Sequence, residues 1–99
     1  MSFIQTIGFS TSRYPEMQAM MDEFDEAQGG QSPGFMGLKI CKDRDHENMY
    51  LVIAEFESYE LAMENSQRPE TDAFAKRMAE MSDSAPSFGN FDLVHEEKP

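Results

Sequence analysis

Three polar side chains, Asn65, Arg68 and Glu70, surround Pro69 in the second half of the sequence. Proline has no backbone N–H and disfavours helix at the residue before it, so Pro69 should interrupt the helical segment that contains them. Such a break can direct polar side chains into a mostly apolar cavity, where a few polar groups fix a ligand's orientation. There Asn65 would hold a substrate oxygen and Arg68 would stabilise a developing anion.

The same three side chains also have a purely structural interpretation. Asn65 caps the end of the broken helix, and Arg68 pairs with a nearby carboxylate. Glu70 begins the next helical turn, where the helix dipole favours an acid. The sequence leaves both interpretations open.

Further candidate site residues come from other segments of the chain. His95 is expected within the last strand, and its unperturbed pKa of about 6.5 suits a general base near neutral pH. The alternative for His95 is an ordinary strand histidine. Tyr50 offers a pocket hydroxyl, or it is a core aromatic with one wet end. The catalytic assignments are Asn65, Arg68 and His95, and the substrate-binding assignments are Tyr50, Glu70 and Phe74.

Metal and cofactor motifs are absent from the sequence. His46 and His95 lack a short ligand spacing, and no acid-rich calcium loop occurs. No glycine-rich phosphate loop or dinucleotide fingerprint occurs either, so we expect neither a metal nor a cofactor. Cys41 is expected to be a small buried side chain without a partnered base, and a single cysteine cannot form an internal disulfide.

The composition limits the class of protein and its partners. The chain has 99 residues and a formal net charge of −11. That length predicts one domain over residues 1–99. The acid excess argues against nucleic-acid and anionic-membrane partners, because both need a basic surface. Neither a run of about 18 apolar residues nor a signal-peptide pattern occurs, and with the single cysteine this predicts a cytoplasmic protein.

Hydrophobic periodicity predicts four strands and two helical regions. Residues 3–10 alternate between apolar and polar side chains, and residues 49–56 are almost continuously apolar, so both should be strands. Apolar side chains recur at helical spacing from Met17 to Phe24, in a helix that ends at Gly29-Gly30. The other predicted elements are strands at 35–42 and 87–96 and an interrupted helical region at 58–82.

The resulting order, β-α-β-β-α-β, is that of the ferredoxin-like split βαβ fold. It predicts an α+β protein with a four-stranded antiparallel sheet, helices on one face, and a second helix interrupted near Pro69. The first and third strands are apolar on both sides, so the uncovered face of the sheet needs a partner. A second copy is the simplest cover, and we predict a homodimer.

Several motifs resemble those of a known superfamily. Phe56-Glu57-Ser58, then Asn65-Ser66-Gln67-Arg68-Pro69-Glu70, then Pro86-Ser87-Phe88-Gly89-Asn90 resemble the dimeric α+β barrel proteins, in particular the antibiotic biosynthesis monooxygenase-like branch with its small bacterial members. The resemblance implies two protomers packed sheet to sheet in a barrel, each with a pocket between its sheet and its helices. It covers essentially the whole chain.

The family resemblance implies either cofactor-independent oxidation of polycyclic quinols or haem degradation. Haem-degrading relatives commonly place an axial histidine in the second helical region, and residues 58–82 contain none. Quinol oxygenases commonly use a pocket tryptophan, and this chain has no tryptophan. Two hypotheses therefore stand: a small monooxygenase-like homodimer that binds a flat hydrophobic aromatic ligand, and a non-catalytic dimeric binding or accessory protein.

Overall fold

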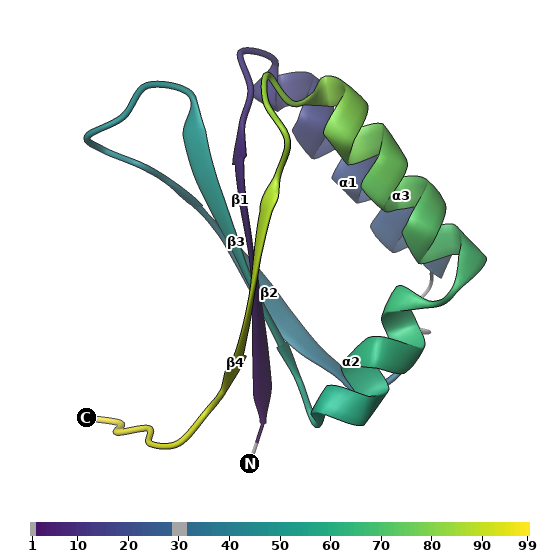
Figure 1. Cartoon of the computed structure of the whole chain (residues 1–99), viewed down its shortest axis with the longest axis vertical. Helices are drawn as coiled ribbons and strands as arrows, with labels where there is room; N and C mark the ends of the chain where they lie inside the picture. Colours follow the sequence, from purple (N-terminus) through teal and green to yellow (C-terminus); the bar gives the residue numbers. More distant parts are fainter. Residues whose placement is uncertain (1, 29–31) are drawn as a thin grey trace.

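The computed structural model describes residues 2–28 and 32–99, which form one four-stranded antiparallel sheet and three helices (Figure 1). The strand order across the sheet is β2-β3-β1-β4. This topology confirms the predicted ferredoxin-like α+β arrangement. The elements are β1 (Phe3–Ser10), α1 (Tyr14–Gln28), β2 (Phe35–Lys42), β3 (Met49–Phe56), α2 (Tyr59–Ser66), α3 (Pro69–Met81) and β4 (Ser87–Asp92).

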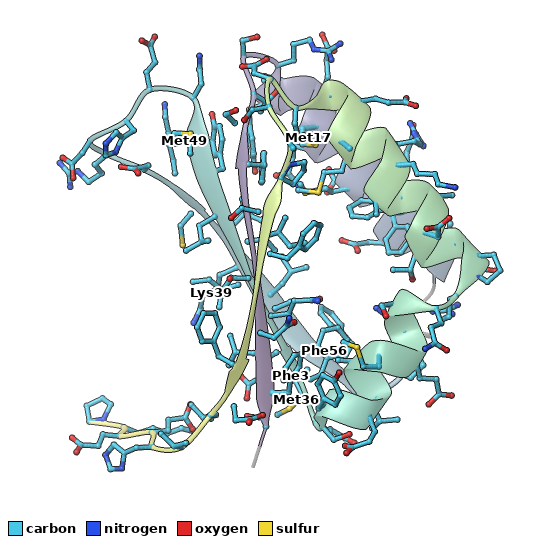
Figure 2. All side chains as sticks on the ribbon, in the orientation of Figure 1. Phe3, Met17, Met36, Lys39, Met49 and Phe56 are labelled. Carbon is cyan, nitrogen blue, oxygen red and sulfur yellow. The ribbon has the colours of Figure 1, made fainter. Side chains whose placement is uncertain are left out.

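All three helices cover the same face of the sheet, and the opposite face carries no helix (Figure 1). Side chains alternate between the two faces along each strand. Phe3 pairs with Phe56 across β1 and β3, and both are buried on the side of the helices. Lys39 of β2 points away from the helices (Figure 2). The sheet therefore has an inner face, which packs against the helices, and an outer face without cover from the described residues.

The buried side chains form two separate clusters on the inner face. The first joins β1 and β3 to α1 and α3, with Phe9 and Met17 essentially inaccessible to solvent. The second joins β1 and β3 to α2 and contains Phe3, Phe56 and Ala62. Each cluster removes several apolar side chains from water. Burial of each large apolar side chain stabilises the fold by about 1.5–3 kcal/mol.

The predicted interruption of the second helical region is confirmed at Pro69. Ser58 caps α2, since its hydroxyl accepts a hydrogen bond from the Leu61 amide at 3.2 Å. Helix α2 ends at Ser66, and α3 begins with Pro69 at its first position. Proline is favoured there because the first helical N–H has no partner within the helix. Two short helices thus replace one long helix.

The structure contradicts the expected end of the last strand and the expected burial of Cys41. Strand β4 ends at Asp92 rather than near residue 96, because its last partner on β1 is Phe3 at the start of that strand. His95 consequently lies beyond the sheet. Cys41 is exposed, not buried, because it lies on the uncovered outer face of β2. The expected helix end at Gly29-Gly30 lies outside the described residues.

Gly34, in the turn before β2, supports a stability prediction. Its φ of +66° is in the left-handed region, and an added Cβ would lie 2.7 Å from Leu61 Cδ1 and 2.8 Å from Leu61 Cβ. Gly34→Ala should therefore lower the free energy of unfolding by about 2–4 kcal/mol, combining backbone strain with overpacking. Urea denaturation at fixed protein concentration measures this change.

Gly37→Ala is the matched control for steric overlap. Gly37 has a φ of +143° but no atom within 4 Å of an added Cβ. Gly37→Ala should therefore lower the free energy of unfolding by the backbone strain alone, about 1–2 kcal/mol. Equal losses in the two variants would show that contact with Leu61 does not constrain this turn.

Candidate functional site

A cavity of about 300 Å³ lies between the inner face of the sheet and the helices. Its walls are mostly apolar: Val52, Ala54 and Phe56 line it from β3, and Met21 and Met78 line it from α1 and α3. Side chains of both core clusters line the cavity, so the cavity lies between the two clusters. Its size is at the lower end of the range for small-molecule sites, about 300–1,000 Å³.

Asn65 contributes an amide to this cavity from the last turn of α2. Its Oδ1 accepts a hydrogen bond from Thr71 Oγ1 of α3 at 3.4 Å, a contact that spans the break between the two helices. No residue in the described ranges 2–28 and 32–99 accepts a hydrogen bond from the amide nitrogen of Asn65. That N–H group is therefore left for a ligand carbonyl or oxyanion.

Gln18 contributes a second amide, from α1. Its Oε1 accepts a hydrogen bond from the Tyr14 hydroxyl at 2.6 Å, and its Nε2 donates to Asp22 Oδ1 at 3.0 Å. Burial, followed by the nearby Tyr50 and Asp22, raises the pKa of the Tyr14 hydroxyl, which stays protonated and able to donate at neutral pH. Gln18 is thus held from both ends of its amide group.

Two carboxylates, Asp25 and Asp72, also line the cavity. Both are exposed to solvent as well, so they lie at its rim. Asp72 pairs with Lys76 one turn later on α3, with 3.0 Å between Oδ2 and Nζ. Partial burial raises the pKa of the Asp25 carboxyl, and the negative charge of Asp22 raises it further. Asp25 thus combines partial desolvation with a like-charged neighbour.

Two of the six residues assigned from the sequence, Asn65 and Phe74, line this cavity. Arg68 does not line it, and its Nε lies 3.7 Å from Glu70 Oε2 in an ion pair that matches the structural interpretation. Glu70 instead lines a shallower depression between α1 and α3, together with Phe74.

The other two assigned residues lie outside the cavity. Tyr50 stacks on Tyr14 with ring centroids 4.5 Å apart and on Phe9 at 5.4 Å, as expected for a core aromatic. His95 is in the exposed C-terminal segment, where its Nε2 lies 2.9 Å from Glu97 Oε1. The structure therefore brings neither residue to Asn65.

Sequence reasoning missed Gln18 and Asp25. They are seven residues apart on α1, which places them on the same helical stripe as Met21. A polar side chain within an otherwise apolar stripe was the available signal. The acid-rich composition of α1 hid it, because most acids on this helix are solvent-exposed.

Neither a metal cluster nor a membrane-spanning helix is found. Within residues 2–28 and 32–99, no group of three or more His, Cys, Asp or Glu side chains is placed to hold a metal ion. In the same part of the chain, no helix is long and apolar enough to cross a membrane.

Asp25→Asn should increase stability at neutral pH. A carboxyl pKa raised by folding contributes stability below its unfolded value, about 3.9, and this contribution is lost as pH rises through the folded value. At neutral pH the variant should gain about 0.3 kcal/mol, the magnitude of a like-charge pair on one helix. Near pH 3 the carboxyl of the parent protein is mostly protonated, so the difference in free energy of unfolding between Asp25→Asn and the parent should disappear. Chemical denaturation at both pH values measures it.

Glu26→Gln is the control, since it removes one charge from the same helix outside the cavity lining. It reports the gain from removing an acid of the same helix, with its own like-charge neighbours Asp22 and Glu23, at a position outside the cavity lining. A gain for Asp25→Asn that persists at low pH would contradict the electrostatic explanation.

Comparisons with known proteins support the fold. No protein-family model and no curated protein matches this sequence. A variant of SnoaB, a cofactor-independent oxygenase from Streptomyces nogalater, has a TM-score of 0.82 over 96% of this chain and 95% of its own, at 18% identity. A candidate antibiotic biosynthesis monooxygenase from Caulobacter crescentus has a TM-score of 0.76 over 95% of this chain and 92% of its own, at 14% identity.

A further structural neighbour is a conserved protein from Methanosarcina mazei, with a TM-score of 0.79 over 92% of this chain and 91% of its own, at 6% identity. Identities this low establish the shared fold and leave the chemistry to the site itself. The resemblance inferred from the sequence motifs is confirmed at this level: the chain has the fold of the antibiotic biosynthesis monooxygenase-like proteins.

Proposed function

We propose that this protein binds a flat hydrophobic aromatic compound in the cavity and oxidises it with O₂ without a cofactor. The observation that carries the proposal is the Asn65 amide, which lines a mostly apolar cavity at the helix break and accepts a hydrogen bond from Thr71 there. The similarity in fold to SnoaB, whose name records a cofactor-independent oxygenase, supports the same chemistry. Phe74 and Met21 supply aromatic and thioether surface for a flat ring system.

The proposed reaction begins when an aromatic hydroxyl of the ligand loses its proton. The Asn65 amide then donates a hydrogen bond to the resulting oxyanion, in surroundings that hold little water. The electron-rich anion transfers an electron to O₂, and the resulting ligand radical and superoxide combine into a hydroperoxide at a ring carbon. Loss of water from this hydroperoxide leaves a ring ketone, so one O₂ converts a ring CH₂ to C=O and releases one water, while the proton of the hydroxyl passes through solvent. Arg68 does not line the cavity, and its ion pair with Glu70 joins the two residues on either side of Pro69.

A non-catalytic binding protein is the second candidate. The observation that favours it is the position of His95 and Arg68, neither of which lines the cavity although both were assigned to catalysis. A cavity that offers amides, hydroxyls and carboxylates can orient an aromatic ligand without reacting with it. In that case the protein acts as a dimeric carrier or accessory module.

We also propose that the protein is a homodimer and cytoplasmic, and the outer face of the sheet supports the homodimer. Ile4 and Ile53 are half-buried there, whereas Leu51 and Phe91 are 39% and 55% exposed. The register places all four on the side opposite the helices. Apolar surface of this kind marks an interface, and a symmetric dimer buries it in one step.

Turnover can be tested by measuring oxygen consumption with a panel of anthrones and naphthalene hydroquinones. The unchanged protein should consume O₂ faster than buffer does. Asn65→Ala should lower kcat/KM about 100-fold, the usual effect of losing one oxyanion donor. The control is Gln67→Ala, which alters an exposed neighbour outside the cavity and should stay within about twofold of the parent.

The two candidate functions predict different results in this assay. Full turnover by Asn65→Ala would contradict the site assignment. Binding of the panel compounds without O₂ consumption would favour the non-catalytic protein.

Leu51→Arg tests the homodimer by sedimentation at micromolar concentration. The unchanged chain should sediment as a dimer and Leu51→Arg as a monomer, because the arginine would bury an unpaired charge in the interface. Ala79→Arg introduces the same charge on the exposed side of α3 and should leave the dimer intact. A monomeric parent protein would contradict the proposal.

A further inference from the structure

Among the described residues, the charged side chains that line the cavity all have one sign. Asp25 and Asp72 line it, whereas no lysine, arginine or histidine among residues 2–28 and 32–99 does. Residues 29–31 are Gly-Gly-Gln and carry no charge. A ligand in this cavity therefore meets carboxylates and no cation from the described lining.

The bases on the neighbouring helices are already paired with acids. Lys76 pairs with Asp72 at 3.0 Å, which offsets that carboxylate. Arg77 of α3 lies 3.8 Å from Glu23 of α1, and Arg68 lies 3.7 Å from Glu70. Each of these bases thus has a carboxylate within 4 Å that offsets its charge, and none of the three bases lines the cavity.

Asp25 differs from Asp72 because no base of the described residues lies within ion-pair distance of it. The Asp22 carboxylate, one turn earlier on α1, repels the ionised form of Asp25 and raises its pKa further after burial. Across the rim, α3 contributes Asp72 with its partner Lys76. The negative charge of Asp25 is therefore not offset at the cavity, and partial burial weakens its screening by water.

We propose that the cavity selects uncharged aromatic ligands over their carboxylated analogues, and that Asp25 is the residue that sets this selection. The inference rests on the proposed function, because it assumes an aromatic ligand in this cavity. Specificity here comes from repulsion of the wrong ligand in addition to contacts with the right one.

The polar groups of the cavity also fit an uncharged hydroxy-ketone. Asn65 offers an N–H donor that suits a ring carbonyl, and Asp25 offers carboxylate oxygens that accept from a ring hydroxyl. Partial burial, and then the negative charge of Asp22, raises the pKa of Asp25, which agrees with its placement at the cavity. Removing that charge should cost the fold nothing, so an Asp25 variant remains suitable for binding experiments.

Chrysophanol and rhein provide a matched pair of probes. Both are dihydroxyanthraquinones, and rhein carries a carboxylate where chrysophanol carries a methyl group. Calorimetric titration of the full chain should give a Kd for chrysophanol at least about tenfold lower than for rhein, a ratio that corresponds to about 1.4 kcal/mol. In Asp25→Asn the ratio should fall to about threefold or less, mainly because rhein binds more tightly.

Glu26→Gln is again the control, because it removes the same charge from the same helix outside the cavity lining. It should keep the ratio of the parent protein. Equal binding of the two probes by the parent, or an unchanged ratio in Asp25→Asn, would overturn the assignment of Asp25. If no protein variant binds either probe, the aromatic ligand class is wrong, and both the proposed function and this inference fail.

Discussion

The break at Pro69 is the constraint on which the rest of the inner face depends. A continuous helix across this region would pack along the sheet and join the two core clusters into one. Instead, α2 packs with the cluster around Phe3 and Phe56, and α3 packs with the cluster around Phe9 and Met17. The cavity lies between the two clusters, lined by side chains from both. A backbone restriction at one residue thus creates the room in which a ligand can bind.

The same break places Asn65 where it is useful. The last turn of α2 leaves side chains that no further turn of the same helix covers. Thr71, near the start of α3, holds the oxygen of the Asn65 amide and so orients its nitrogen. The helix break, the cavity and the position of the Asn65 amide therefore all follow from the proline at position 69. This connection explains why the most useful prediction from the sequence came from the residues around the proline.

Elements with strong local signals were predicted well. The apolar periodicity of 49–56 and of the helix from Met17 onward, and the proline at position 69, specify strand, helix and break without reference to distant residues. Strand β4 was predicted too long because its end depends on where its partner β1 begins. Cys41 was misplaced because residues of both faces look alike within an apolar strand.

The residues that line the cavity were harder to predict because they come from both helical regions and from the sheet, which are distant in the sequence. The cavity is lined by side chains that come together only when the helices pack on the sheet, such as Gln18, Asp25 and Thr71. Arg68 and His95 show the reverse difficulty, since their chemistry suited the hypothesis and their positions did not bring them to the cavity. Residue type is local information, whereas the direction of a side chain is set by tertiary packing.

The methionines of the cavity wall have a consequence for the lifetime of the protein. Met21 and Met78 present thioethers to the space proposed to hold O₂ and an electron-rich ring. Peroxide released there would meet sulfur before it reached bulk water. Conversion to the sulfoxide would place a polar oxygen in an apolar wall shared with the core. The methionine surface that suits a flat ligand would therefore also be the surface that the proposed reaction could oxidise.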